Sequence, residues 1–325
     1  MNLRLGIYDL AARHRLEANT TRRLQQLAGL EEEPVALRRW TWRGIAVLAA
    51  ALGGFGVILW VAANWEALGR FGRFALLQGL VLTLCAGALW RPAARAPLGL
   101  LALLGIGGLF AYFGQTYQTG ADPWQLFALW AALALPLCFA ARSDVLWAPW
   151  TLVAMAAIGL WTHAHSGHRW HVRADDLAVH ALAWGAAVLL AVALAPPWKR
   201  FTGAGPWALR TAVTLLVIMV ALTAIGGLFA RTVAPHYALG LLVLAAAALL
   251  FASRRGFDIF AISALALGLN TLLVAGLARF LFENDRGGEI GPLFLIGVAA
   301  AGLLAASVGA ILHLSQRYQE AGESS

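Results

Sequence analysis

Residues 44–63 read GIAVLAAALGGFGVILWVAA, twenty consecutive positions without a charged side chain. An α-helix rises about 1.5 Å per residue, so about 20 apolar residues cross the roughly 30 Å hydrocarbon layer of a membrane. Hydrocarbon offers no hydrogen-bond partner to backbone N–H and C=O groups, and a helix satisfies these groups within one segment. The stretch therefore predicts a membrane-spanning helix.

Nine further apolar runs follow the first. Together the ten runs are predicted as spans at roughly 44–63, 72–90, 97–113, 124–141, 145–162, 178–195, 207–230, 236–252, 257–282 and 290–312. The breaks between the runs contain proline, glycine and charged residues, which interrupt helices or remain in water. The sequence thus predicts an all-α fold, a polytopic integral membrane helical bundle of about ten transmembrane helices.

The overall composition excludes a soluble globular protein. Of the 325 residues, 61% are hydrophobic and 12% are charged, whereas a soluble domain carries about 25% charged residues. The net charge of +8 would suggest nucleic-acid binding in a soluble protein. Here the basic residues lie in short clusters between apolar runs, a pattern typical of contact with anionic lipid headgroups. We expect membrane lipid as a partner, and no nucleic acid.

Lysine and arginine are unevenly divided between the two sides of the predicted bundle. With a cytoplasmic N-terminus, 17 of the 24 basic residues fall on the cytoplasmic side and 7 on the outer side. Because basic residues concentrate on the cytoplasmic side of a membrane protein, both termini are expected there. The predicted domains are a cytoplasmic helical hairpin at 1–43, the transmembrane bundle at 44–312 and a cytoplasmic tail at 313–325. The hairpin either docks a partner or anionic lipid, or its apolar stripes simply pack against each other.

One outer connection, GQTYQTGADPWQLF at 114–127, contains no lysine or arginine. Its second half is typical of a capped turn, since an aspartate followed by proline suits the start of a helix. Its first half supplies uncharged donors and acceptors beside an aromatic ring, a composition suited to a sugar, a headgroup or the backbone of a partner protein. A capped turn and a binding surface both remain open. The candidate ligand- or partner-binding residues are Gln115, Thr116, Tyr117, Gln118, Asp122 and Trp124.

Three features in order resemble a known family. They are a basic N-terminal helical pair, a first span that ends LWVAANW at 59–65, and the segment GQTYQTGADPWQLFALWAALALP at 114–136. Over roughly the first 145 residues the chain resembles the bacterial predicted membrane protein family called domain of unknown function 2157. The resemblance implies a polytopic inner-membrane protein of the bacterial cell without an established activity, and it supplies no catalytic residues. It also implies a second, membrane-anchored protein as a candidate partner.

A histidine-rich connection follows the fifth predicted span. It carries two neighbouring aspartates, Asp175 and Asp176, and four histidines, His163, His165, His168 and His171. Imidazole and carboxylate groups are ligands for zinc, copper or nickel, so the four histidines are candidate metal ligands. Their loose spacing and the nearby arginines equally fit a solvated loop. A third interpretation is pH sensing, because histidine titrates near neutral pH.

Some polar side chains fall at membrane depth. Asn270 lies near the middle of the ninth span, Gln78 in the second and His180 near the start of the sixth. Such groups either bond across helices or line a pathway. Charged residues are absent from the span centres, which weakens the case for a proton- or sodium-coupled carrier. Trp130 and Trp184 lie deeper than the other tryptophans and are expected to pack between helices.

The chain has no Walker loop, HExxH motif or GxSxG elbow. We therefore predict no cofactor and do not favour an enzyme. The expected role is a membrane component of an envelope complex in the bacterial inner membrane, which binds a protein or a lipid-linked partner at its outer face. A transporter or channel for a small solute is the first alternative, and a membrane enzyme acting on a lipid-linked substrate is the second.

The orientation can be measured with reporter fusions. Alkaline phosphatase, which is active only outside the cytosol, should be active when fused after Gly120 or after Ser166, because both residues lie in predicted outer connections. A green fluorescent protein fused after the last residue should fluoresce. Inactive phosphatase at both outer positions would contradict the orientation.

Overall fold

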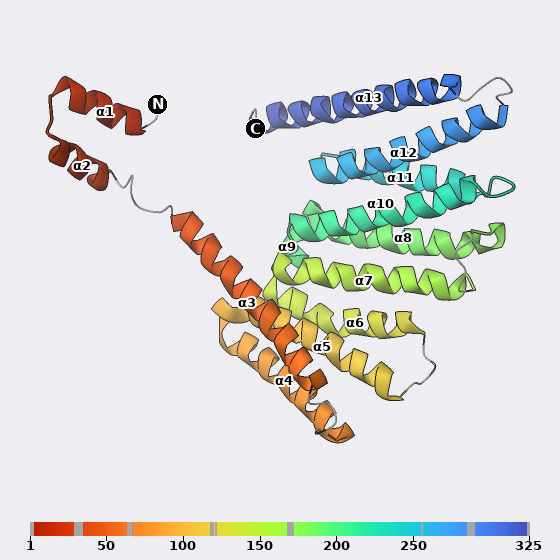
Figure 1. Cartoon of the computed structure of the whole chain (residues 1–325), viewed down its shortest axis with the longest axis horizontal. Helices are drawn as coiled ribbons and strands as arrows, with labels where there is room; N and C mark the ends of the chain where they lie inside the picture. The colour runs from red at the N-terminus through yellow and green to blue at the C-terminus, as the bar shows by residue number, and fades with distance from the viewer. Residues whose placement is uncertain are drawn as a thin grey trace. The chain divides into compact units, whose positions relative to one another are not determined.

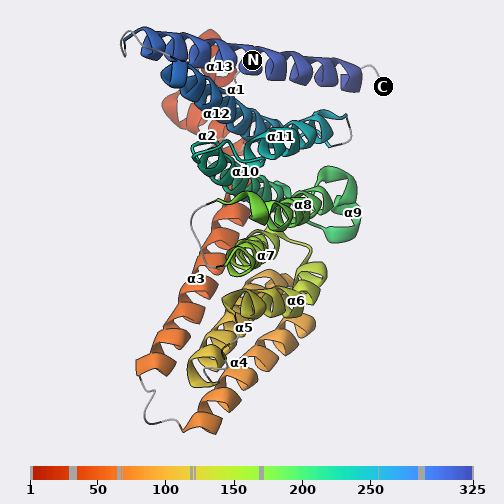
Figure 2. The ribbon, with the colours of Figure 1, turned by 90° about the vertical axis from the view of Figure 1, so that its right-hand side faces the viewer.

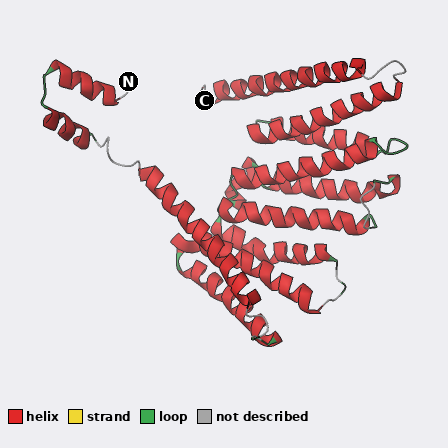
Figure 3. Cartoon of the chain, in the orientation of Figure 1, coloured by secondary structure: helices red, strands yellow, loops and turns green. Residues whose placement is uncertain are grey.

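The computed structural model describes residues 3–28, 35–63, 67, 69–117, 120, 122–167, 172–254, 256–284 and 290–323. Within these ranges the chain forms thirteen α-helices and three short 3-10 helices, with no strand (Figure 3). The predicted all-α fold is therefore confirmed. Nine of the described helices are long and apolar enough to cross a membrane.

Residues 1–52 and 53–325 form two compact units, and the boundary falls inside helix α3 (Val35–Ala63). In the first unit, α1 (Leu3–Arg13) and α2 (Ala18–Leu27) contact each other and form a helical hairpin. The start of α3 lies nine residues before the predicted start of the first span. Arginine and tryptophan do not interrupt a helix, so the basic residues before the apolar run continue the same helix.

The second unit contains the remaining helices in chain order (Figures 1 and 2). They are α4 (Arg70–Trp90), α5 (Arg95–Tyr117), α6 (Pro123–Ala141), α7 (Asp144–His165), α8 (Leu177–Ala193), α9 (Lys199–Thr202), α10 (Pro206–Leu228), α11 (His236–Ala252), α12 (Ile259–Asn284) and α13 (Ile290–Glu323). The 3-10 helices are η1 (Pro92–Ala94), η2 (Ala174–Asp176) and η3 (Pro196–Trp198).

Most predicted spans agree with these helices to within a few residues. Helix α11 covers the predicted run 236–252, but its 17 residues lie at the lower limit of about 17–25 for a span. The predicted ends of two spans were too early. Helix α5 continues from 113 to Tyr117, and α13 continues through the predicted tail to Glu323. Polar residues in the last turn of a membrane helix lie in the headgroup layer, so the helix can continue through them.

Helices α7 and α10 occupy the centre of the second unit. Helix α7 packs against α5, α6, α8 and α10, and α10 packs against α7, α8, α11 and α12. Their contact surfaces are built from buried aliphatic side chains, among them Leu146, Leu209, Val213, Leu216 and Val220. The C-terminal ends of α7, α10 and α12 lie on one side of this unit, at the right in Figure 1. This side is the predicted outer face.

Tryptophan side chains join neighbouring helices. The Nε1 group of Trp130 donates a hydrogen bond of 2.9 Å to the carbonyl oxygen of Leu103, and that of Trp150 donates one of 2.8 Å to the carbonyl of Ala131. In a membrane an indole N–H without an acceptor is costly, so these bonds help to fix the positions of α5, α6 and α7. Trp130 packs between helices as expected, and Trp184 is completely buried.

The predicted inner ends of α7 and α10 are joined by one carboxylate. Asp144, the first residue of α7, accepts hydrogen bonds from the backbone N–H of Gly205 at 2.6 Å and of Trp207 at 2.8 Å. These N–H groups belong to the start of α10, where a negative charge is also favoured by the helix dipole. The contact fixes the register of α7 against α10.

We predict that Gly107→Ala destabilises the protein. The ring of Trp130 lies against the Cα of Gly107, so an added methyl group would overlap with it. Overpacking of this kind costs about 1–3 kcal/mol. Thermal unfolding in detergent should therefore begin at a lower temperature. Gly79→Ala is the matched control, because nothing lies within 4 Å of its added methyl group. Equal stability of both variants would contradict the tight contact.

Candidate functional site

The first residues of the predicted outer segment are helical. Gln115, Thr116 and Tyr117 form the last turn of α5, and the ring of Tyr117 packs against Phe74 and Phe113, with centroid distances of 5.8 and 4.9 Å. The Tyr117 ring thus contributes to packing between α4 and α5, although 44% of the residue remains exposed. Gln118 lies outside the described residues.

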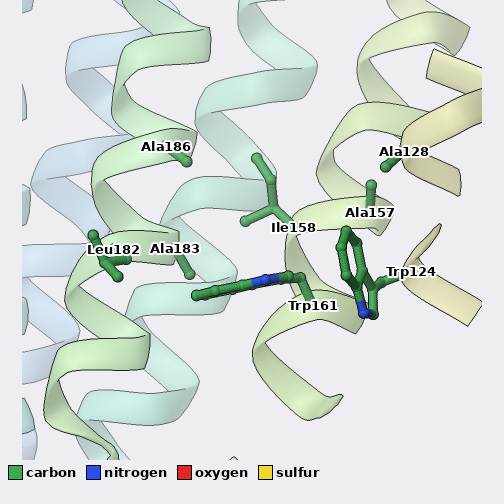
Figure 4. Close-up of a pocket in the computed structure, with 8 residues that line it drawn as sticks. All are labelled: Trp124, Ala128, Ala157, Ile158, Trp161, Leu182, Ala183 and Ala186. Atoms are coloured by element: carbon green, nitrogen blue, oxygen red, sulfur yellow. The ribbon is translucent and has the colours of Figure 1, made fainter. Parts of the chain in front are cut away.

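The other half of the segment lies against a different part of the bundle. Asp122 and Pro123 occupy the N-cap and the first position of α6, as predicted, but the Asp122 side chain makes no capping hydrogen bond to the helix. Trp124 and Trp161 line an apolar cavity of about 390 Å³ between α6, α7 and α8 (Figure 4). Tyr117 packs toward α4 and Trp124 toward α7. The described residues of the predicted surface therefore lie in two separate environments.

The histidines of the outer connection are only partly described. His165 is exposed, and its ring stacks on Trp161 with a centroid distance of 4.4 Å. Its Nδ1 lies 2.9 Å from the Trp161 carbonyl oxygen. His163 lines a cavity between α7, α8 and α10, whereas His168 and His171 lie outside the described residues. Among the residues that the structure describes, no three His, Cys, Asp or Glu side chains converge as metal ligands.

The two predicted intramembrane polar residues have different surroundings. Asn270 of α12 is half-buried, and its Nδ2 donates hydrogen bonds to the Oγ of Ser307 at 3.0 Å and to the carbonyl of Leu303 at 3.4 Å. Both acceptors belong to α13, so Asn270 joins two helices. Gln78 is exposed on α4.

Two cavities lie along the central helices. One cavity has a volume of about 520 Å³ and an apolar lining. It is formed by α6, α7 and α10. Its lining residues are Phe127, Trp130, Leu152, Val153, Met155, Ala156, Gly159, Leu215, Ile218 and Met219. The other has a volume of about 300 Å³ and lies at the predicted outer ends of α7 and α10, beside the start of α8. Its polar lining residues are Thr162, His163, Ser166, His180 and Thr223.

The two cavities are neighbours along α7 and α10. Gly159 of α7 and Met219 of α10 line both of them. Along α7 the lining residues recur every three or four positions from 152 to 166, and along α10 they recur in the same way from 215 to 226. Residues at this spacing lie on one face of a helix. We call the combined space the α7–α10 groove.

A buried polar cluster lies behind the outer end of the groove. The Nδ1 of His180 is 2.9 Å from the carbonyl oxygen of Asp176 and 3.2 Å from the Nε2 of His236. The two imidazole rings are nearly perpendicular, at 85°, and His236 and Trp184 are completely buried. The Nδ1 of His236, the Nε1 of Trp184 and the Oδ2 of Asp176 are buried without a hydrogen-bond partner. Unsatisfied polar atoms are rare in protein interiors and concentrate at functional sites.

The pairing of His180 with His236 could not be read directly from the sequence, because 56 residues separate them. The available signal was topological. Both histidines stand near the start of spans predicted to run from the outer face inward, and that topology places the two residues at the same depth. His236 itself was missed, because it follows a proline at a span boundary and resembles an ordinary loop residue.

Comparison with known proteins identifies the N-terminal part of the chain. Residues 8–147 match the family model described as Predicted membrane protein (DUF2157). The match confirms the resemblance and extends from α1 to the beginning of α7. No curated protein and no solved structure shows significant similarity to the chain. Together with the apolar helices, the match establishes a multi-pass membrane protein.

The role of Asn270 can be tested by a double-mutant cycle with Ser307. Asn270→Leu should lower the free energy of unfolding by roughly 0.6–2 kcal/mol, because an interhelical hydrogen bond is lost in the membrane. Ser307→Ala should cost less, because the Asn270 amide also bonds the Leu303 carbonyl. The two effects should be non-additive in the double variant, measured by unfolding in detergent. Strictly additive effects would show that the two side chains do not interact.

Proposed function

We propose that this chain is a bacterial inner-membrane protein that holds a lipid or lipid-linked molecule in the α7–α10 groove at its outer face, as the membrane component of an envelope complex. The observation that carries the proposal is the junction of an apolar and a polar cavity at Gly159 and Met219. An amphipathic molecule needs both environments in that order along the membrane normal.

The apolar part of the groove suits a hydrocarbon chain. Its volume of about 520 Å³ is lined by aliphatic and aromatic side chains. Leu152 and Ile218 at its edge are about half exposed, at 52% and 48%. In a membrane this exposure is toward the acyl chains of the bilayer. A lipid could therefore enter from the side without its tail leaving hydrocarbon.

The polar part suits a headgroup. It is lined by threonine, serine and histidine side chains at the predicted outer ends of α7 and α10. Ligand sites commonly combine an apolar cavity with a few polar groups that orient the ligand. Lys, Arg, Asp and Glu are absent from its described lining, so the headgroup is recognised by hydrogen bonds.

Among the functions expected from the sequence, this arrangement favours a lipid-linked partner over a soluble solute. Asn270, for which the sequence left open an interhelical bond or a place in a pathway, donates a hydrogen bond to Ser307 of α13. A membrane-anchored protein remains the proposed partner within the complex, and it would receive or present the lipid at this face.

Filling the groove should prevent binding. Gly159→Leu places a side chain at the junction, where nothing lies within 4 Å of an added Cβ. Gly185→Leu adds the same side chain to the exposed face of α8, where the Cβ is equally free. The purified protein would be placed in nanodiscs with a phospholipid that carries a photoreactive group in its acyl chain, and labelled peptides would be mapped by mass spectrometry.

The wild-type protein should be labelled mainly on the groove faces of α7 and α10. We expect Gly159→Leu to reduce this labelling roughly tenfold, equivalent to about 1.4 kcal/mol, and Gly185→Leu to leave it unchanged. Even labelling of all lipid-facing helices, with no effect of Gly159→Leu, would refute the proposal.

A further inference from the structure

The three hydroxyl groups of the polar cavity have all donated their protons to their own helices. Thr162 Oγ1 donates to the carbonyl of Ile158 at 2.9 Å, and Thr223 Oγ1 donates to that of Met219 at 2.9 Å. Ser166 Oγ donates to the carbonyl of His163 at 3.2 Å. A hydroxyl has one proton and two lone pairs. While these bonds are in place, each of these oxygens presents only lone pairs to a molecule in the cavity.

His180 adds a fourth acceptor. Its Nδ1 lies 2.9 Å from the carbonyl oxygen of Asp176, and because a carbonyl can only accept, the proton of the neutral ring belongs on Nδ1. The Nε2 of His236 lies 3.2 Å from the same nitrogen. The Nε2 of His180 then carries a lone pair. Because Nδ1 is engaged and His180 lines the cavity, Nε2 is the nitrogen available to a ligand.

Hydrogen-bond donors are scarce in the described lining of this cavity. His163 is the remaining polar residue, and a neutral imidazole supplies at most one donor. The other lining residues are Gly159, Val172, Met219, Leu222 and Gly226. Gly159, Met219, Leu222 and Gly226 lie inside helices, where the backbone N–H groups are already bonded within the helix, and Val172 precedes η2 with its backbone N–H outside a helix. Among the described lining residues, four side-chain acceptors thus face at most one side-chain donor.

We infer that the polar cavity selects a neutral headgroup that bears several hydroxyl groups, as a glycosyl headgroup does. This inference rests on the proposed function and names its class of lipid. Hydroxyl protons on the ligand would satisfy the four acceptors. A phosphate would place its negative oxygens against their lone pairs. An ammonium group would supply donors, but the described lining contains no carboxylate to offset the loss of its hydration.

The test uses competition in nanodiscs. A photoreactive lipid labels the groove, and three lipids with identical acyl chains compete with it: a glucosyl diacylglycerol, a phosphatidylethanolamine and a phosphatidic acid. We expect the glucosyl lipid to compete at least tenfold better than the other two, which corresponds to about 1.4 kcal/mol.

Two variants connect this preference to the acceptors. Thr223→Val removes one acceptor with little change of shape and should reduce the advantage of the glucosyl lipid about threefold to tenfold, as expected for one hydrogen bond. Thr211→Val is the matched control, because Thr211 stands on the same helix and its Oγ1 makes the same type of bond, to the Trp207 carbonyl, away from the groove. His180→Phe should also reduce the advantage, and size-exclusion chromatography would show whether this variant remains folded.

The outcomes separate the two proposals. If the groove is labelled but phosphatidic acid or phosphatidylethanolamine competes as well as the glucosyl lipid, the headgroup inference is wrong and the proposed function stands. Retention of the full preference by Thr223→Val would also overturn the inference. If no lipid labels the groove in the wild-type protein, both proposals fail.

Discussion

Hydrocarbon cannot satisfy a polar group, and the rest of this structure depends on that constraint. It keeps the backbone helical in each span and directs the indole N–H groups of Trp130 and Trp150 to carbonyl oxygens of neighbouring helices. The same constraint acts on hydroxyl groups, because Thr162, Ser166 and Thr223 donate to carbonyls of their own helices. These bonds leave the oxygen lone pairs of the three hydroxyl groups facing the polar cavity.

The α7–α10 groove depends on the central position of α7. Asp144 fixes its first turn to the start of α10, so the faces of the two helices stay in register toward their other ends. Small side chains on the groove face, above all Gly159, leave space between them. Behind the outer end, the fully buried His236 and Trp184 surround His180. The groove is thus bounded by interactions that hold the central helices together.

Local sequence patterns predicted the helices well and the site poorly. Apolar runs located α6, α7, α8, α10 and α11 to within three residues at either end, because membrane thickness determines span length. They ended α5 and α13 too early, since hydropathy falls in the headgroup layer while the helix continues. Tyr117 and Trp124 are close in sequence but pack in different environments, so a motif in one connection did not amount to one binding surface.

Composition and hydrophobic periodicity by themselves determined the solvent and the helical fold, because both depend on runs of neighbouring residues, and the motifs at 59–65 and 114–136 carried the resemblance of the N-terminal part to a known family. The tertiary structure alone decided which distant side chains meet. His180 pairs with His236, and Gly159 and Met219 line the same cavities, only because α7, α8, α10 and α11 pack side by side. Contacts between helices depend on which face of each helix is turned inward. The packing of the whole bundle determines which face of each helix is turned inward, so the sequence of one segment does not determine it.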